Sequence, residues 1–70
     1  MTRARRNGET VEQRPAAELG DADLGRIVQT PGHRGVLRAV WTDEDGLRAV
    51  CTTTGVAHYP PTAPFLVWGP

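Results

Sequence analysis

The 70-residue chain has one cysteine, no lysine, two tryptophans, one tyrosine and one phenylalanine. With Cys51 as the only thiol, no intramolecular disulfide forms, and a single cysteine is typical of a small buried apolar residue in a reducing compartment. No apolar run reaches the roughly 18 residues of a transmembrane helix, and the charged N-terminus has no apolar core of a secretory signal. We therefore expect a cytoplasmic protein without a membrane segment.

The length also limits what the chain can build. Seventy residues make at most one domain, and chains of this size bury only about 60% of their unfolded surface, so we expect no deep substrate cavity. Eight arginines balance eight acidic residues, giving zero formal net charge. The overall positive field that steers nucleic-acid-binding proteins is therefore missing.

Residues 1–20 are polar, charged and nearly free of large apolar side chains. Such a segment buries too little apolar surface to offset the entropy of ordering it, which predicts a flexible N-terminal tail. One helical turn could begin at Pro15, a residue suited to the first helical position, and end at Gly20.

From Leu24 onward, apolar and polar residues alternate in short segments separated by turn residues, which indicates an all-β domain over residues 21–70. Asp43 to Gly46 fits a type I turn with a left-handed glycine, and this hairpin places Trp41 opposite Ala49. The alternation predicts that Leu37, Ala39 and Trp41 face the core, together with Ala49 and Cys51. We expect five strands, near residues 25–30, 35–41, 47–53, 56–59 and 65–68.

These five strands resemble an SH3-like small β-barrel, because a long first loop, a tight acidic hairpin, a second tight turn and a proline-rich crossing separate them. Within this class, residues 25–40 resemble the KOW element of ribosomal and transcription-factor barrels, a strand followed by a glycine turn and a second glycine-led strand. The resemblance rests on Gly25, Val28, Gly32, Gly35 and Val36. It implies a barrel fold and a loop that contacts RNA.

Several residues could carry chemistry, but none forms a catalytic or metal signature. His33, His58 and Cys51 are three widely spaced ligands, whereas structural zinc needs four, usually in close pairs. The three acids of the hairpin tip, 43–45, have no neighbour that would raise a carboxyl pKa for acid catalysis. We therefore expect no enzyme, metal site or cofactor.

The leading hypothesis is a non-enzymatic interaction module, an accessory or regulatory subunit that binds a protein partner. Aromatic side chains beside prolines line peptide grooves in SH3-like folds, and extra aromatic surface near the last crossing points to such a groove. The alternative for these residues is that they cap the end of the barrel. Self-association through an exposed final strand is a variant of the hypothesis. The predicted partner-binding residues are Tyr59, Pro61, Phe65, Trp68, Arg38 and Arg48.

The second hypothesis is binding of RNA or single-stranded DNA. His33 and Arg34 lie between two glycines, in a loop where a backbone can approach a phosphate closely. Three further arginines at the N-terminus would add salt-dependent phosphate contacts. A solvated loop and a solvated terminus are the structural alternatives for these residues. The predicted nucleic-acid contacts are Arg3, Arg5, Arg6, His33 and Arg34.

Overall fold

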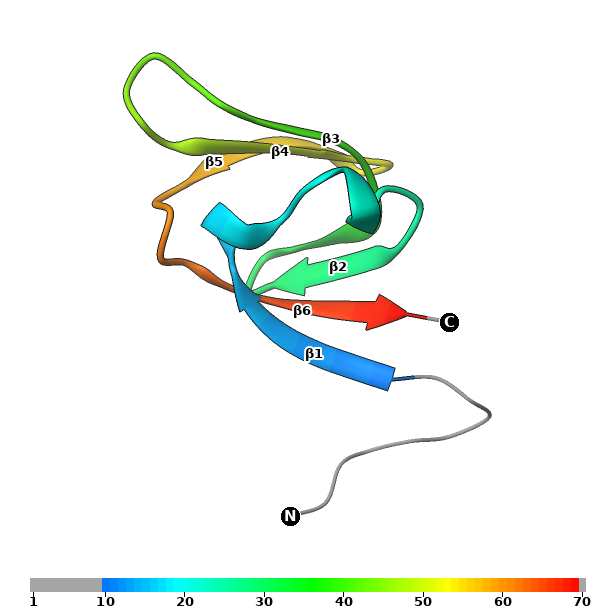
Figure 1. Ribbon diagram of the computed structural model, residues 1–70. Helices are drawn as coiled ribbons and strands as arrows, with labels where there is room; N and C mark the ends of the chain where they lie inside the picture. The colour runs from blue at the N-terminus through cyan, green and yellow to red at the C-terminus, as the bar shows by residue number, and fades with distance from the viewer. Residues whose placement is uncertain (1–9, 70) are drawn as a thin grey trace.

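A computed structural model describes residues 10–69, which form six antiparallel strands and two single 3₁₀ turns but no α-helix (Figure 1). No helix within these residues is long and apolar enough to cross a membrane. The elements in chain order are β1 Thr10–Pro15, η1 Ala16–Glu18, η2 Asp21–Asp23, β2 Ile27–Thr30, β3 His33–Thr42, β4 Arg48–Thr52, β5 Gly55–Tyr59 and β6 Pro64–Gly69.

The strands form one sheet in the order β1-β6-β2-β3-β4-β5. Strand β3 belongs to both halves of this sheet, because residues 33–36 pair with β2 and residues 37–42 pair with β4. The two halves face each other as two layers with η1 and η2 beside the gap between them (Figure 1). The all-β prediction is confirmed, but the sheet has six strands rather than five. It stays open at β1 and β5 and does not close into a barrel. The expected self-association through an exposed final strand is wrong, because β6 lies between β1 and β2.

The β3–β4 hairpin has the predicted turn and register. The Gly46 N–H donates to the Asp43 carbonyl at 3.1 Å, Gly46 has φ 83°, and Trp41 lies opposite Ala49. This agreement follows from local turn chemistry, since a type I turn closed by a left-handed glycine allows only this pairing.

The predicted inward face of the hairpin is confirmed at Leu37 and Ala49, which are fully buried, but it is wrong at Trp41; Ala39 and Cys51 are half-buried. A bulge shifts the register between Leu37 and Ala39, and one extra residue reverses which side chains face inward. Leu37 is fully buried, and Val40 then faces the core opposite Val50. Trp41, expected in the core, is instead 45% exposed.

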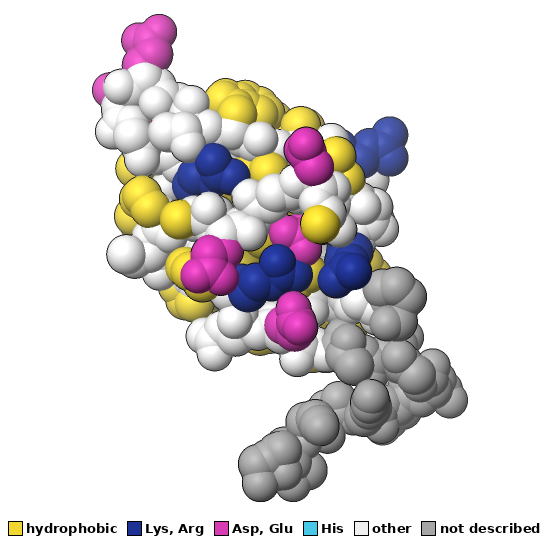
Figure 2. All heavy atoms as spheres, viewed as in Figure 1, with side chains coloured by type: hydrophobic (Ala, Val, Ile, Leu, Met, Phe, Trp, Pro, Cys, Tyr) yellow, Lys and Arg dark blue, Asp and Glu magenta, His cyan; other side chains and the backbone are white. Residues whose placement is uncertain are grey.

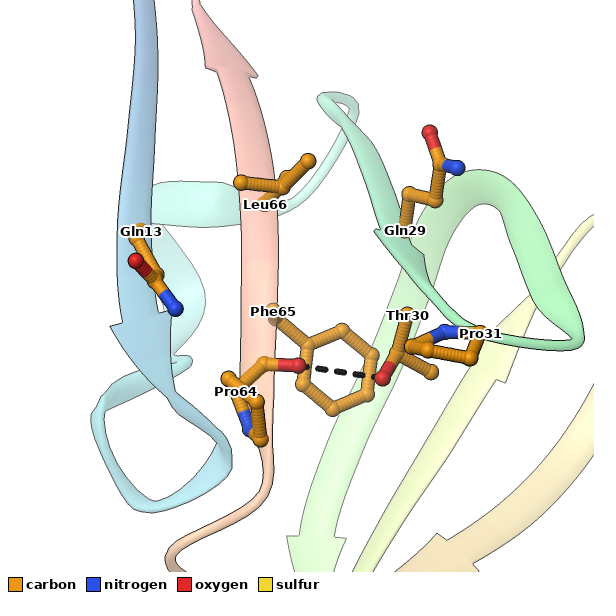
Figure 3. Close-up of a pocket in the computed structure, with 7 residues that line it drawn as sticks. All are labelled: Gln13, Gln29, Thr30, Pro31, Pro64, Phe65 and Leu66. Carbon is orange, nitrogen blue, oxygen red and sulfur yellow. Dashed lines mark hydrogen bonds between the residues drawn. The ribbon is translucent and has the colours of Figure 1, made fainter.

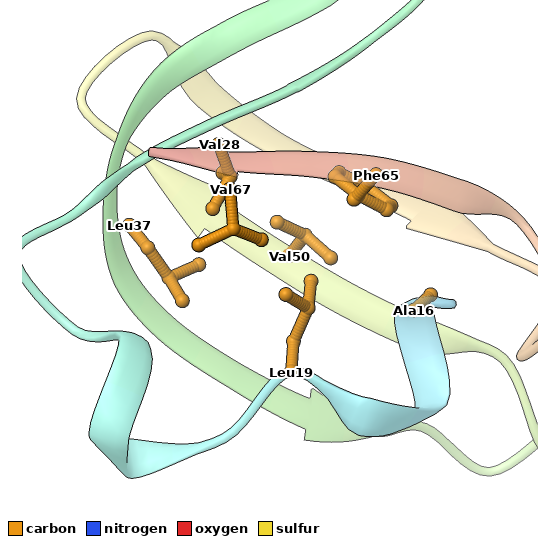
Figure 4. Close-up of a cluster of buried hydrophobic side chains, with 7 residues drawn as sticks. All are labelled: Ala16, Leu19, Val28, Leu37, Val50, Phe65 and Val67. Atoms are coloured by element: carbon orange, nitrogen blue, oxygen red, sulfur yellow. The ribbon is translucent and has the colours of Figure 1, made fainter. Parts of the chain in front are cut away.

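The predicted tail is also wrong over residues 10–20, which are part of the folded domain; residues 1–9 and 70 lie outside the described residues. Strand β1 pairs with β6 along its whole length. The turn expected after Pro15 is the 3₁₀ turn η1, and Ala16 and Leu19 are buried there. Figure 4 shows the side chains of this core, which are Ala16, Leu19, Val28, Leu37, Val50, Phe65 and Val67.

A buried ion pair between Arg14 and Asp23 holds the segment of β1 and η1 in place. Asp23 is 2% exposed, and its carboxylate accepts hydrogen bonds from both terminal nitrogens of Arg14 at 2.6 and 3.2 Å. The Gly20 N–H donates to the same carboxylate at 3.0 Å. The two contacts from Arg14 tie β1 to η2, and all three hydrogen bonds compensate the desolvated charge of Asp23.

Candidate functional site

The outward-facing row of β6 forms the main candidate surface. Because side chains alternate along a strand, Phe65 and Val67 point into the core while Leu66 and Trp68 point outward. Leu66 lies opposite Gln13 on β1 and Gln29 on β2. We call this the β6 outer surface, and its members are Val11, Gln13, Ile27, Gln29, Leu66 and Trp68.

One end of the β6 outer surface is a hollow of about 340 Å³ (Figure 3). Pairing of β2 with β6 stops at Gln29 and Leu66, and beyond that point the Thr30 hydroxyl donates to the Pro64 carbonyl at 3.0 Å. Leu66, 38% exposed, lies in this hollow with the amides of Gln13 and Gln29. The hollow offers an apolar contact beside amides that donate and accept hydrogen bonds. Its lining is completed by Pro31, Pro64 and Phe65.

A second hollow, of about 540 Å³, lies beside Trp68 at the other end. The guanidinium carbon of Arg34 lies 5.3 Å from the centroid of the Trp68 ring, a cation–π arrangement. Arg26 and the 43% exposed Leu24 also line this hollow. No acidic side chain among the described residues lines either hollow, so the whole surface is apolar and amide-bearing at one end and cationic at the other.

The side chains of His33 and Arg34 lie on opposite faces of β3. Arg34 reaches the outer surface, whereas the half-buried imidazole of His33 hydrogen-bonds the Tyr59 hydroxyl through Nδ1 and the Thr52 hydroxyl through Nε2, both at 2.8 Å. A neutral imidazole has one donor and one acceptor nitrogen, and either hydroxyl can take the complementary role. Both ring nitrogens of His33 are thus satisfied within the fold, so His33 does not present a free nitrogen to a ligand.

Gly32 allows the backbone conformation of the turn, and Gly35 allows close packing of β3 against Thr52. Gly32 has φ 86°, the left-handed conformation of the turn between β2 and β3. A Cβ at Gly35 would lie 2.7 Å from the Thr52 Oγ1, so the absence of a side chain lets β3 approach Thr52. Neither glycine is needed to bring the backbone close to a ligand.

The six predicted partner-binding residues do not form one surface. Tyr59 and Phe65 pack edge to face with ring centroids 5.0 Å apart, and Phe65 is 1% exposed, on the inner side of β6. Burial raises the pKa of the Tyr59 hydroxyl above its ordinary value of 10.0. Trp68 lies on the outer side of β6, away from these two rings.

The remaining three residues are also apart. Arg48 donates to the carbonyls of Leu19 at 2.6 Å and Ala16 at 3.2 Å, so it secures η1. Pro61 is exposed, and its carbonyl accepts the N–H of Ala17 at 2.9 Å. Arg38 is exposed at the bulge of β3. Of the six residues, only Trp68 belongs to the β6 outer surface. Phe65 lines the hollow around Leu66.

Of the predicted nucleic-acid contacts, Arg3, Arg5 and Arg6 lie outside the described residues. On the face that carries η1 and η2, arginine side chains alternate with aspartate and glutamate rather than gathering in a patch of one sign (Figure 2). That face therefore has a mixed charge and no continuous path for a phosphate backbone.

Residues 10–69 contain no group of three His, Cys, Asp or Glu side chains placed to hold a metal ion. His58 and Asp43 form a pair, with the imidazole Nδ1 2.7 Å from the carboxylate Oδ2. The hydrogen bond with His58, followed by those from the N–H groups of Leu47 and Asp45, lowers the pKa of Asp43 below 3.8. A carboxylate held ionised in this way secures the hairpin turn and is a poor general acid.

No family model matches this chain, and neither a curated protein nor a solved structure matches it.

Sequence reasoning missed Gln13, Gln29 and Leu66. The alternation in residues 65–68 already places Leu66 on the same side as Trp68. The two glutamines gave no signal, because their position beside Leu66 depends on β6 pairing with both β1 and β2, and these pairings are distant in sequence.

Proposed function

We propose that this protein is a non-enzymatic interaction module that binds an extended segment of a protein partner along the β6 outer surface. The observation that carries the proposal is the hollow around Leu66, an exposed apolar side chain between two glutamine amides and two prolines. A hollow with an apolar floor and a few polar groups is the usual form of a small binding site.

The chemistry of the two hollows favours a particular kind of segment. An apolar side chain of the partner fits beside Leu66, while Gln13 and Gln29 hydrogen-bond its backbone. Arg34 and Arg26 in the second hollow favour a carboxylate further along the same segment. The proposed ligand is therefore an extended peptide with an apolar residue followed or preceded by an acidic one.

The connections between strands support an SH3-like arrangement for β2 to β6. The chain has a tight acidic hairpin at residues 43–46, a two-residue turn at 53–54 and a proline-containing crossing at 60–63. The order β6-β2-β3-β4-β5 of these five strands, with β1 added outside β6, is consistent with that proposal. The unpaired Cys51 fits a reducing compartment, and we propose that the module acts in the cytoplasm.

Selection from a random peptide library tests the proposed function. Peptides that bind the wild-type chain should bind the L66Q variant at least about tenfold more weakly, which corresponds to losing about 1.4 kcal/mol of apolar contact. Amide NMR shifts on binding should map to Gln13, Gln29 and Leu66. W41Q is the matched control, because Trp41 is similarly exposed but lies on the other half of the sheet. Peptides that bind L66Q and the wild type equally well would refute the proposal.

Nucleic acid is the second candidate, because Arg26 and Arg34 line one hollow with Trp68. Stacking of a base on Trp68 between these cations would resemble other single-strand sites. It predicts that the wild-type chain binds a single-stranded RNA pool at low salt, that affinity falls steeply as salt rises, and that the R34Q variant loses affinity. Absence of binding at low salt would remove this candidate.

A further inference from the structure

The two edges of the open sheet differ in how they are protected against pairing with another strand. Edge strand β1 carries Glu12, Arg14 and Pro15, and charges and proline at an edge discourage further pairing. Edge strand β5, Gly55–Tyr59, contains no Asp, Glu, Arg or Pro, and its Val56 is 53% exposed. The sequence therefore leaves β5 as the unprotected edge.

The hydrogen-bonding pattern of the hairpin shows which backbone groups of β5 are free. The Asp43 N–H donates to the Leu47 carbonyl at 2.8 Å, so these two residues are a hydrogen-bonded pair of the hairpin. Hydrogen-bonded pairs recur at every second residue of an antiparallel ladder, so Trp41 and Ala49 are the next such pair across β3 and β4. Alternate residues of β4, which are 48, 50 and 52, therefore bond to β5.

Their partners on β5 are Tyr59, Ala57 and Gly55. The N–H and C=O groups of Val56 and His58 consequently point away from β4 toward the open edge. No other described element contributes a backbone hydrogen bond to these two residues. The two N–H and two C=O groups of Val56 and His58 can therefore hydrogen-bond to an added strand along this edge.

We propose that β5 pairs with β5 of a second copy of this chain, antiparallel about a two-fold axis through Ala57. In this register Val56 lies opposite His58 of the copy, and His58 opposite its Val56, so all four free groups form hydrogen bonds. Ala57 lies on the axis as a non-hydrogen-bonded pair, where Cα atoms approach to about 4.5 Å and only a small side chain fits well.

The neighbouring registers satisfy fewer groups. A shift that places His58 opposite itself also places Val56 opposite Pro60, which has no N–H to donate. A shift in the other direction pairs His58 with Thr54, whose N–H already donates to the Thr52 hydroxyl at 3.1 Å. The register centred on Ala57 is therefore the one that the strand itself favours.

The side chains of the paired edge support the same arrangement. Val56 and His58 lie on the outer side of the β3-β4-β5 half, opposite Cys51 and Ala49. The imidazole Nδ1 of His58 lies 2.7 Å from the Asp43 carboxylate. In the dimer the His58 ring lies beside Val56 of the copy and keeps this carboxylate partner. Joining two β5 strands would continue this outer row, in which Val56, Cys51 and Ala49 lie beside the polar His58, from one chain into the next.

An interface of two short strands is small, below about 1,200 Å², and such interfaces are typical of weak, transient association. Sedimentation of the full 70-residue chain should show the mass of two chains at millimolar concentration and of one chain at micromolar concentration. The V56K variant should stay monomeric throughout. A22K is the control, since Ala22 is exposed and lies in η2, outside both β5 and the β6 outer surface, and this variant should dimerise like the wild type.

Amide hydrogen exchange distinguishes this interface from any other self-association. Exchange at Val56 and His58 should slow at least tenfold between dilute and concentrated protein, while exchange at Ala57 and Tyr59 stays slow at both concentrations. A single-chain mass at millimolar concentration would overturn the proposal, and so would a dimer of V56K. Protection of Val56 and His58 in the dilute monomer would overturn it as well. The test is independent of the peptide site, which lies on the β6 outer surface.

Discussion

A methyl group at Gly35 would lie 2.7 Å from Oγ1 of Thr52, so β3 reaches this position only because residue 35 has no side chain. The Thr52 hydroxyl has little freedom to move, since it also bonds Nε2 of His33 at 2.8 Å. We expect G35A to lower the free energy of unfolding by about 1–3 kcal/mol through overpacking. Urea denaturation followed by fluorescence measures the loss.

The control for this substitution is G20A. Gly20 has φ −153° and no atom within 4 Å of an added Cβ, so its unfolding free energy should change by less than about 0.5 kcal/mol. Equal stability of G35A and G20A would contradict the close contact with Thr52.

The Arg14–Asp23 pair should contribute strongly to stability. Removing the carboxylate in D23A leaves the partly buried guanidinium of Arg14 with only the exposed carboxylate of Glu12, 3.3 Å away, and breaking a buried pair in this way costs about 3–5 kcal/mol. The exposed D21A in the same turn should change stability by less than about 0.5 kcal/mol. A small effect of D23A in urea denaturation would show that β1 and η2 are not coupled through this pair.

Acid should weaken the β3–β4 hairpin through Asp43. Because the pKa of Asp43 is lower in the folded chain than its ordinary 3.8, its contribution to stability is complete above that value and is lost as pH falls through the folded-state pKa. Carboxyl carbon NMR should give a midpoint below 3.8 for Asp43. In the H58A variant the midpoint should rise, because the hydrogen bond from His58 is the main cause of the shift. An unchanged midpoint would contradict that cause.

High pH should lower the stability of the fold through ionisation of Tyr59. Burial raises its folded-state pKa above 10.0, so its contribution to stability is present below pH 10 and is lost as pH rises through the folded-state value. Tyr59 is the only tyrosine, so ultraviolet absorbance reports its ionisation directly. The midpoint in folded protein should exceed that in urea, and coincident midpoints would mean that the hydroxyl is solvated.

The two tryptophans should differ in accessibility. Trp41 is 45% exposed, whereas Trp68 is half-buried beneath the Arg34 guanidinium. Acrylamide should therefore quench fluorescence more strongly in W68F, which retains Trp41, than in W41F, which retains Trp68. The opposite order would place Trp41 in the core and contradict the bulge after Leu37.

Part of the candidate site could be read from the sequence. The outward position of Trp68 beside Leu66 follows from alternation within one short strand. The role of His33 could not be predicted, because its partners, Tyr59 and Thr52, are 26 and 19 residues away. The same applies to Arg48, which bonds carbonyls 32 and 29 residues earlier in the chain.

The sequence alone determined the all-β class, the five strands between residues 25 and 69, and the pairing of Trp41 with Ala49. These features depend on alternation and turn chemistry within a few residues. The tertiary structure decided the rest. The bulge after Leu37 turned Val40 into the core and Trp41 out of it, because bending β3 between two sheet layers required an extra residue. The polar segment before residue 20 became β1 and η1, since β6 offered a strand to pair with and the core had room for Ala16 and Leu19.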